Sequence, residues 1–262
     1  MNKLQLAALS VAASAFVFSA ASTAEEVKIG ATPVPHAEIL EFIKPTLKAQ
    51  GLDLTIVEFN DYVQPNLATD EKELDLNFFQ HRPYLENFIK DHGVNLVEVG
   101  AIHIEPMGVY SSKIKDLKDL KEGASVAIPN DPTNGGRALL LLQSAGLISL
   151  EDPKSITATP LDVVKNPKKL DIKELEAPQL PRSLDEVDIA VINTNYAIQA
   201  KLNPLKDAIY IEGSDSPYVN IVVGNPESAK KADVKKVVDA LKTPEVKKFI
   251  EEKYNGAVVP AF

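Results

Sequence analysis

The stretch SVAIPNDPTNGGRALLLLQSA, residues 125–145, decides the fold class of this chain. Residues 125–129 form an apolar run with the length of a short buried strand, and residues 138–145 have the length and propensity of a helix interior. Strand, turn and helix therefore follow one another without a long connection. That order is typical of an α/β fold, in which helices pack against a largely parallel sheet.

The turn between this strand and this helix, residues 130–137, has the composition of an anion-binding site. Asp131 or Thr133 can cap the helix, which places residues 134–136 in its first turn. Backbone N–H groups in a first turn lack intrahelical partners and attract anions. We expect Gly135 and Gly136 to let a ligand approach the backbone closely, because neither residue carries a Cβ atom.

Arg137 follows the glycines and offers a planar guanidinium that can hold a carboxylate through two hydrogen bonds. The alternative is an ordinary tight turn with Arg137 on the surface, since glycine-rich turns are weak signals by themselves. Residue choice favours the binding site. Only three of the 28 basic residues are arginines, at positions 82, 137 and 182, and a two-bond grip on a carboxylate is the task that lysine performs worst.

Outside this stretch, strand-like and helix-like runs alternate along the chain. The apolar patterns predict strands over residues 27–30, 54–59, 74–78, 96–99, 125–128, 172–175 and 189–192. They predict helices over residues 37–50, 66–73, 83–91 and 138–145, and two amphipathic helices within 233–254, the second beginning at Pro244.

Two segments are expected to carry the chain between two sheets. Residues 104–110 lead from the first set of strands to the second, and residues 216–223 return the chain to the first sheet. We therefore predict an α/β fold with two lobes, in which residues 25–106 with 219–262 form lobe 1 and residues 107–218 form lobe 2.

Residues 1–24 have the pattern of a secretory signal peptide, with Lys3 before an apolar stretch and Ser22-Thr23-Ala24 as a small-residue cleavage site. The apolar stretch is shorter than a membrane span needs. The chain contains no cysteine, so it has neither disulfides nor the thiol that a lipid anchor requires. We expect a mature protein that begins after Ala24 and is soluble in the periplasm.

The formal net charge of −9 becomes about −10 once Lys3 is removed with the signal peptide. The charges are spread over many lysines and glutamates, as on an ordinary solvated surface. Nucleic acid is therefore not an expected partner.

A group of aromatic and polar residues follows the ends of two predicted strands, in FNDYVQPN (59–66) and NFFQHRPY (77–84). Ligand crevices of open α/β sheets form at this edge. Tyr62, Phe79, His81 and Tyr84 could build an aromatic pocket there, suited to an apolar or sulfur-containing side chain. One of Phe78 and Phe79 must point into the core, because neighbouring strand residues face opposite ways. Taken alone, His81 is more often a helix cap than a ligand contact.

Amide side chains form a third group of candidates. Asn193 or Asn195 follows a predicted buried strand, and Asn220 closes the segment SPYVN. Each amide offers a donor and an acceptor, which suits an α-ammonium and an α-carboxylate held side by side. Asparagines also stabilise turns, and for any one of them alone this is the ordinary role.

These blocks resemble the methionine-binding NlpA family of ABC-importer substrate-binding proteins. The resemblance runs from about residue 27 to the end of the chain and is carried by long motifs: FNDYVQPN, NFFQHRPYL, VAIPNDPTNGGRALLLLQ, ELEAPQLPRSLD, VINTNYA and SPYVN. It implies a type II periplasmic-binding-protein fold, with two α/β lobes joined by two crossover segments. It also implies closure on L-methionine, without enzymatic activity, and delivery to a permease and its ATPase at the inner membrane.

The resemblance assigns the ligand-binding residues as well. An aromatic pocket around the thioether and a polar group around the amino-acid backbone are implied; together they comprise Tyr62, Phe79, His81, Tyr84, Asn134, Arg137, Asn193 and Asn220. This favours the pocket role for His81. Because most family members carry a lipid-anchor cysteine after the signal, which Ser22-Thr23-Ala24 replaces here, membrane anchoring is not inferred.

Three alternatives remain open at this point. The ligand could be a methionine-containing dipeptide or another apolar amino acid. A secreted hydrolase is the second alternative, but the chain has no Gly-x-Ser-x-Gly nucleophile elbow, no His-Glu-x-x-His zinc motif and no cysteine nucleophile. The four histidines of the chain show no metal-ligand spacing. A surface adhesin with an incidental crevice has no positive feature in its favour. We expect the protein to be a monomer, and we expect it to bind no cofactor and no metal.

Overall fold

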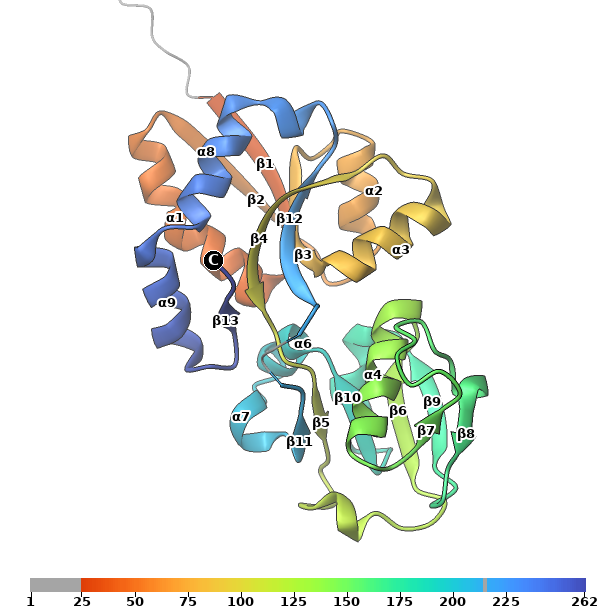
Figure 1. Ribbon diagram of the computed structural model, residues 1–262. Coiled ribbons are helices and arrows are strands. Elements are labelled where there is room, and N and C mark those ends of the chain that lie inside the picture. The colour runs from red at the N-terminus through yellow and green to blue at the C-terminus, as the bar shows by residue number, and fades with distance from the viewer. Residues whose placement is uncertain (1–24, 214–215) are drawn as a thin grey trace, which may run out of the picture.

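The fold is described from a computed structural model, for residues 25–213 and 216–262. It consists of two α/β lobes stacked end to end (Figure 1). The predicted signal peptide, residues 1–24, lies outside the described residues. No helix within the described ranges is long and apolar enough to cross a membrane.

Lobe 1 is built on a six-stranded sheet with the order β13-β4-β12-β3-β1-β2. The strands are β1 (Glu25–Ala31), β2 (Leu52–Glu58), β3 (Leu76–His81), β4 (Val97–Ile104), β12 (Val219–Gly224) and β13 (Val259–Pro260). β1 pairs in parallel with β2 and β3, whereas β12 runs antiparallel between β3 and β4. The late strand β12 thus lies inside the sheet, between two strands from the first part of the chain.

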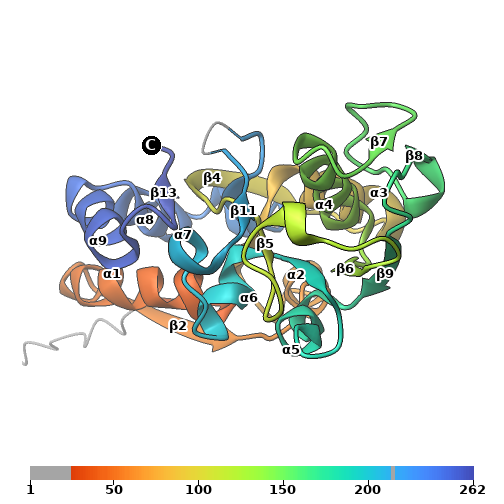
Figure 2. The same cartoon turned by 90° about the horizontal axis from the view of Figure 1, so that it is seen from below.

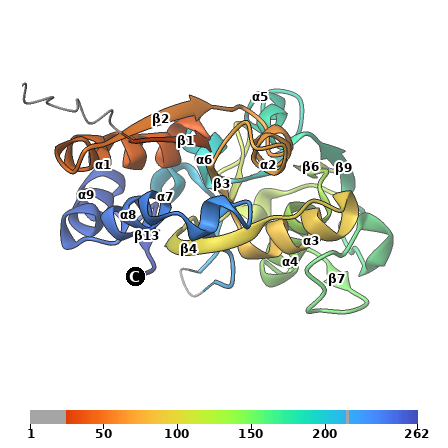
Figure 3. The same cartoon turned by 90° about the horizontal axis from the view of Figure 1, so that it is seen from above.

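Helices cover both faces of this sheet, as Figure 3 shows from above. They are α1 (Glu38–Ala49), α2 (Gln64–Asp70), α3 (Arg82–His92), α8 (Ala232–Leu241) and α9 (Pro244–Tyr254). Apolar residues of α1, α8 and α9 pack with one core. Those of α3 pack with Phe79 and the other face of β12. A helical turn, Pro33–Ala37, precedes α1 and brings in His36.

Lobe 2 is built on a five-stranded sheet with the order β11-β5-β10-β6-β9. The strands are β5 (Gly108–Tyr110), β6 (Ser125–Pro129), β9 (Asp171–Leu175), β10 (Ile189–Ile192) and β11 (Tyr210–Ile211). Its helices are α4 (Pro132–Ser144), α5 (Leu180–Ser183), α6 (Thr194–Gln199) and α7 (Pro204–Asp207), and β7 (Ser149–Leu150) pairs with β8 (Val163–Lys165) at its edge. Figure 2 shows α4 and α5 on opposite faces of the sheet, each with its own core.

The chain passes between the lobes from β4 to β5, through residues 105–107, and again from β11 to β12. The predicted fold class, two α/β lobes joined by two crossovers, is confirmed. Placement of the lobe boundaries after residues 106 and 218 stays a prediction. The strand-turn-helix stretch also folds as predicted: the Asp131 side chain caps α4, which begins at Pro132, so the glycines lie inside the beginning of the helix.

Candidate functional site

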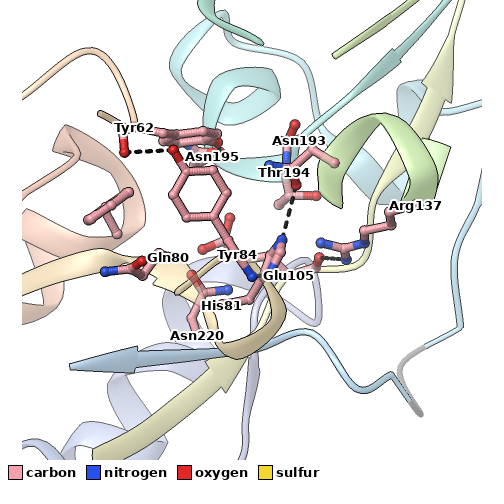
Figure 4. Close-up of a pocket in the computed structure, with 12 residues that line it drawn as sticks. Tyr62, Gln80, His81, Tyr84, Glu105, Arg137, Asn193, Thr194, Asn195 and Asn220 are labelled. Atoms are coloured by element: carbon pink, nitrogen blue, oxygen red, sulfur yellow. Dashed lines mark hydrogen bonds between the residues drawn. The ribbon is translucent and has the colours of Figure 1, made fainter. Parts of the chain in front are cut away.

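A small cavity lies between the two lobes, with an empty volume of about 330 Å³ (Figure 4). All eight residues predicted for the site are among its walls, and four further residues join them. The lining consists of Tyr62, Phe79, Gln80, His81, Tyr84, Glu105, Asn134, Arg137, Asn193, Thr194, Asn195 and Asn220. Most of them come from the carboxyl ends of β3 and β10 and from the first turns of α4 and α6, the edge at which α/β proteins form ligand crevices.

The first turn of α4 is fixed by Asp131, whose side chain accepts a hydrogen bond from the backbone N–H of Asn134 at 2.9 Å. Thr133, the other candidate cap, instead donates its hydroxyl to Asp131. The expected role of the glycines is wrong. A Cβ atom on Gly135 would lie 2.9 Å from the carbonyl oxygen of Pro129, and one on Gly136 would lie 2.3 Å from that of Ile156. The glycines therefore admit neighbouring backbone, and neither of them lines the cavity.

Asn134 is held by three neighbours. Its Nδ2 donates to both carboxylate oxygens of Asp131 at 3.0 and 2.9 Å. Its Oδ1 accepts from Asn193 Nδ2 at 2.8 Å and from His81 Nε2 at 3.0 Å. Because His81 belongs to β3 and Asn134 to α4, this contact joins the two lobes.

His81 combines both of the roles considered for it. Its Nδ1 accepts from the backbone N–H of Tyr84 at 3.1 Å and so caps α3, while its Nε2 donates to Asn134 across the cavity. Burial, with a contribution from the Arg137 charge, lowers the pKa of His81 to about 3. His81 is therefore a neutral imidazole with one fixed tautomer.

Arg137 is only 3% exposed, so it is not the surface residue of the alternative. Its Nε and Nη2 donate to the two carboxylate oxygens of Glu212, and Nη2 also donates to the backbone oxygen of Glu105 at 2.8 Å. The guanidinium lies 4.2 Å from the ring centroid of Tyr218. The two-bond edge predicted to hold a ligand carboxylate is thus occupied by Glu212. Nη1 has no hydrogen-bond partner among the described residues.

Aromatic rings form one wall of the cavity. The ring centroid of Tyr62 lies 5.8 Å from that of Phe79 and 5.9 Å from that of Tyr84. The Tyr84 hydroxyl donates to the backbone oxygen of Tyr62, and the Tyr62 hydroxyl donates to Asn195 Oδ1 at 2.6 Å. The expectation for the phenylalanine pair is confirmed, since Phe78 lies in the core and Phe79 lines the cavity.

Both Asn193 and Asn195 reach the cavity, so the choice left open between them is not exclusive. Asn193 Oδ1 and Asn195 Nδ2 are buried and have no hydrogen-bond partner among the described residues. One is an acceptor and the other a donor. Asn220, at the start of β12, uses its Oδ1 to accept from His36 Nε2 at 3.0 Å.

The residues missed by sequence reasoning are Gln80, Glu105 and Thr194. Glu105 matters most, because it is the single acidic residue among the described residues lining the cavity. Burial raises the pKa of its carboxyl, while His36 and Arg137 act to lower it. An acidic residue inside the apolar crossover 104–110 was a visible signal for it.

Glu105 also belongs to the one compact group of possible metal ligands found in the described ranges, with His36 and His103. Oε1 of Glu105 lies 3.3 Å from Nε2 of His36 and 2.8 Å from Nε2 of His103. His36 Nε2 faces a second acceptor, Asn220 Oδ1, so it carries a proton and is not a free metal ligand. Hydrogen bonds thus account for this contact without an ion.

Comparison with known proteins finds the same organisation elsewhere. The sequence pattern of the family described as NlpA lipoprotein matches residues 27–262. The D-methionine-binding lipoprotein MetQ of Salmonella typhi is 49% identical over 236 residues, which cover 89% of this chain and 87% of that protein. A nutrient binding protein from Burkholderia cenocepacia bound to methionine has a TM-score of 0.87 at 48% identity, over 90% of this chain and 100% of that chain.

An ABC transporter periplasmic substrate-binding protein from Coxiella burnetii is also similar, with a TM-score of 0.85 at 44% identity over 90% of this chain and 100% of that chain. At these identities and coverages the likeness extends to both lobes and to both crossovers. It confirms the predicted type II periplasmic-binding-protein fold.

Proposed function

This chain belongs to the NlpA lipoprotein family, and on that basis we propose that it is the substrate-binding protein of an ABC importer, with L-methionine as its ligand. The observation that supports this best is the composition of the interlobe cavity. One guanidinium, one carboxylate and a wall of aromatic rings surround it. A zwitterion with an apolar thioether chain matches each of these in turn.

Each end of the ligand has partners of the opposite kind. The α-ammonium donates to Glu105 and to Asn193 Oδ1. The α-carboxylate accepts from Arg137 Nη1 and from Asn195 Nδ2, and the side chain packs against Tyr62 and Phe79. Because Asn193 Oδ1 and Asn195 Nδ2 are buried without a partner among the described residues, a ligand that pairs with them removes an unfavourable desolvation term.

The cavity between the lobes is small, which favours a single amino acid over a dipeptide. A methionine-containing dipeptide is the second candidate, and it would require wider lobe separation. Both enantiomers of methionine need testing, since the Salmonella relative is named for D-methionine.

The mechanism is binding coupled to lobe closure, without chemistry on the ligand. Hydrogen bonds already join the lobes from Tyr62 to Asn195 and from His81 to Asn134. A ligand that contacts both lobes binds the closed form more tightly and therefore shifts the population toward it.

The closed form then delivers the ligand to a permease and its ATPase at the inner membrane. We propose that the receptor acts as a monomer in the periplasm and, without a cysteine, carries no lipid anchor.

A thermal-shift and calorimetry panel tests the function. Mature protein is unfolded, dialysed free of ligand, refolded, and titrated with L-methionine, D-methionine, methionine dipeptides and other apolar amino acids. A ligand at a thousandfold excess over its Kd should raise the free energy of unfolding by about 4 kcal/mol. A shift with a dipeptide alone would move the substrate assignment, whereas no shift across the panel would contradict the receptor function. Recovery of unaltered ligand by mass spectrometry checks that no reaction occurs.

A further inference from the structure

Glu105 is a buried carboxylate whose side-chain oxygens form no ion pair with a lysine or an arginine among the described residues. It is 5% exposed, and among the described residues its ion-pair contacts come only from His36 and His103. The guanidinium of Arg137 is paired with Glu212 and reaches only the backbone oxygen of Glu105. A buried charge of this kind is unfavourable unless hydrogen bonds or an opposite charge compensate it.

Two neutral histidines lie against this carboxylate: His103 donates a hydrogen bond to it, and His36 contacts it while donating its own hydrogen bond to Asn220. Nε2 of His36 faces two acceptors, Asn220 Oδ1 at 3.0 Å and Glu105 Oε1 at 3.3 Å, so it must carry the proton. Nδ1 of His36 then accepts from the hydroxyl of Thr32, 2.7 Å away.

His103 follows the same pattern. Its Nε2 lies 2.8 Å from Glu105 Oε1, and its buried Nδ1 has no partner among the described residues. A proton on Nε2 satisfies the carboxylate and avoids a buried N–H group without an acceptor. Burial lowers the pKa of His36 to about 4 and that of His103 to about 3, which agrees with two neutral rings.

Both rings therefore face one oxygen atom, Oε1, which accepts the hydrogen bond of His103 and lies 3.3 Å from Nε2 of His36. A carboxylate has about four acceptor positions, so Glu105 retains capacity on the side that lines the cavity. Figure 4 shows Glu105 between His81 and Arg137. The histidines lie behind it, His36 in the turn Pro33–Ala37 and His103 in β4.

We propose that His36 and His103 are positioning residues that hold the Glu105 carboxylate as the acceptor for a ligand ammonium group, so that this triad makes the site select ligands with a free α-amino group. The inference rests on the proposed function and deepens it. Neither histidine is among the residues that line the cavity, so their effect on the ligand passes through Glu105.

The test compares two ligands that differ only at the amino group, L-methionine and 4-(methylthio)butanoate. Calorimetry gives the Kd of each for the wild type, His103→Phe, which keeps a flat ring but no donor, and His103→Gln, which restores an N–H donor. Loss of a hydrogen bond to a charged group should weaken methionine binding by roughly tenfold or more. Binding of the des-amino ligand should change less than about twofold in the same variant, and His103→Gln should recover part of the methionine affinity.

Glu105→Gln provides a second route should His103→Phe fail to fold, and it should remove the preference for methionine over the des-amino ligand. His92→Gln is the matched control, because His92 lies on the exposed side of α3, and both affinities should stay unchanged. Equal losses for both ligands in His103→Phe would mean a general structural role and would overturn the inference. So would a wild type that binds the two ligands equally well. A wild type that binds neither ligand would overturn the proposed function itself.

Discussion

Arg137 shows how a residue can be identified from sequence while its contacts cannot. The scarcity of arginine and the adjoining helix start pointed to it, and it lines the cavity. Its partner Glu212 lies 75 residues away in the second crossover, and no local pattern connects the two. The guanidinium is therefore held by the protein on one edge and presents Nη1 to a ligand.

Replacement of Arg137 by alanine should weaken methionine binding by about 2–5 kcal/mol, because it removes the ligand's cationic partner and leaves Glu212 unpaired. Calorimetry on ligand-stripped protein measures the change. Arg82→Ala is the matched control, since Arg82 pairs with Glu98 at the surface and should leave the affinity intact. An unchanged affinity in Arg137→Ala would contradict the proposed site.

Local patterns and the family resemblance together predicted eight cavity residues but missed Glu105. The difference has a physical cause. Most of the eight lie at or after strand ends or in the first turns of helices, and such positions leave a local pattern. His103 lies only two residues before Glu105, but His36 reaches the same carboxylate from the distant turn Pro33–Ala37, and that contact depends on tertiary packing.

At the scale of elements, the alternation of strand and helix patterns was sufficient to predict the main sheets. The short elements were not predicted, among them β11, β13, and the pair β7 and β8. Runs of two or three residues carry too little periodicity to be recognised, and partners distant in sequence stabilise them. The close approach of residues 156 and 157 to the start of α4 was not predicted either. In the sequence its only sign is Gly136, where a Cβ atom would collide with that backbone.

Gly136→Ala should therefore destabilise the protein by about 1–3 kcal/mol through overpacking. The added methyl group would meet the backbone of Ile156 and Thr157, which cannot move aside as a flexible side chain can. Urea unfolding of ligand-free protein measures the loss. Gly213→Ala is the matched control, as no described atom lies within 4 Å of its Cβ position. Equal stability of the two variants would show that the contact is readily relieved.

On the scale of the whole molecule, closure depends on a few side chains that cross between the lobes. The Tyr62 hydroxyl reaches Asn195 from lobe 1 to lobe 2, and α3 lies against α4 (Figure 1). These contacts exist only when the lobes are together. Their contribution therefore falls on the closed form and not on the stability of either lobe.

Tyr62→Phe should accordingly lower ligand affinity by roughly five- to a hundredfold, since the closed form loses a buried hydrogen bond worth about 1–3 kcal/mol. The melting temperature without ligand should change little. Calorimetry and small-angle scattering report affinity and closure. Tyr210→Phe serves as control, because its hydroxyl contacts Ser144 within lobe 2. A large loss of ligand-free stability in Tyr62→Phe would indicate a structural role instead.

Folding stability should fall on acidification from pH 7 toward pH 5. Burial lowers the pKa of His36 to about 4 and the pKa values of His81 and His103 to about 3, from 6.5. Below pH 6.5 the unfolded chain thus binds protons that the folded chain does not, which favours unfolding by up to about 1.4 kcal/mol per pH unit for each histidine. Glu105 and Asp131, whose pKa values burial raises, offset part of this slope.

Melting temperatures recorded at several pH values test this dependence, and His81→Gln should flatten it by removing one of the three titrating groups. A melting temperature that is higher at pH 5 than at pH 7 would contradict the assignment of neutral buried histidines.

Two of the cavity residues, Glu105 and Asn220, lie in or directly beside the segments that connect the lobes. Residues near a hinge move little when two lobes rotate, whereas residues far from it move much more. This part of the binding site should therefore keep its geometry at every lobe angle, and the aromatic wall and Arg137 complete the site on closure. A ligand can bind to these two residues first, so its association rate need not be limited by lobe movement.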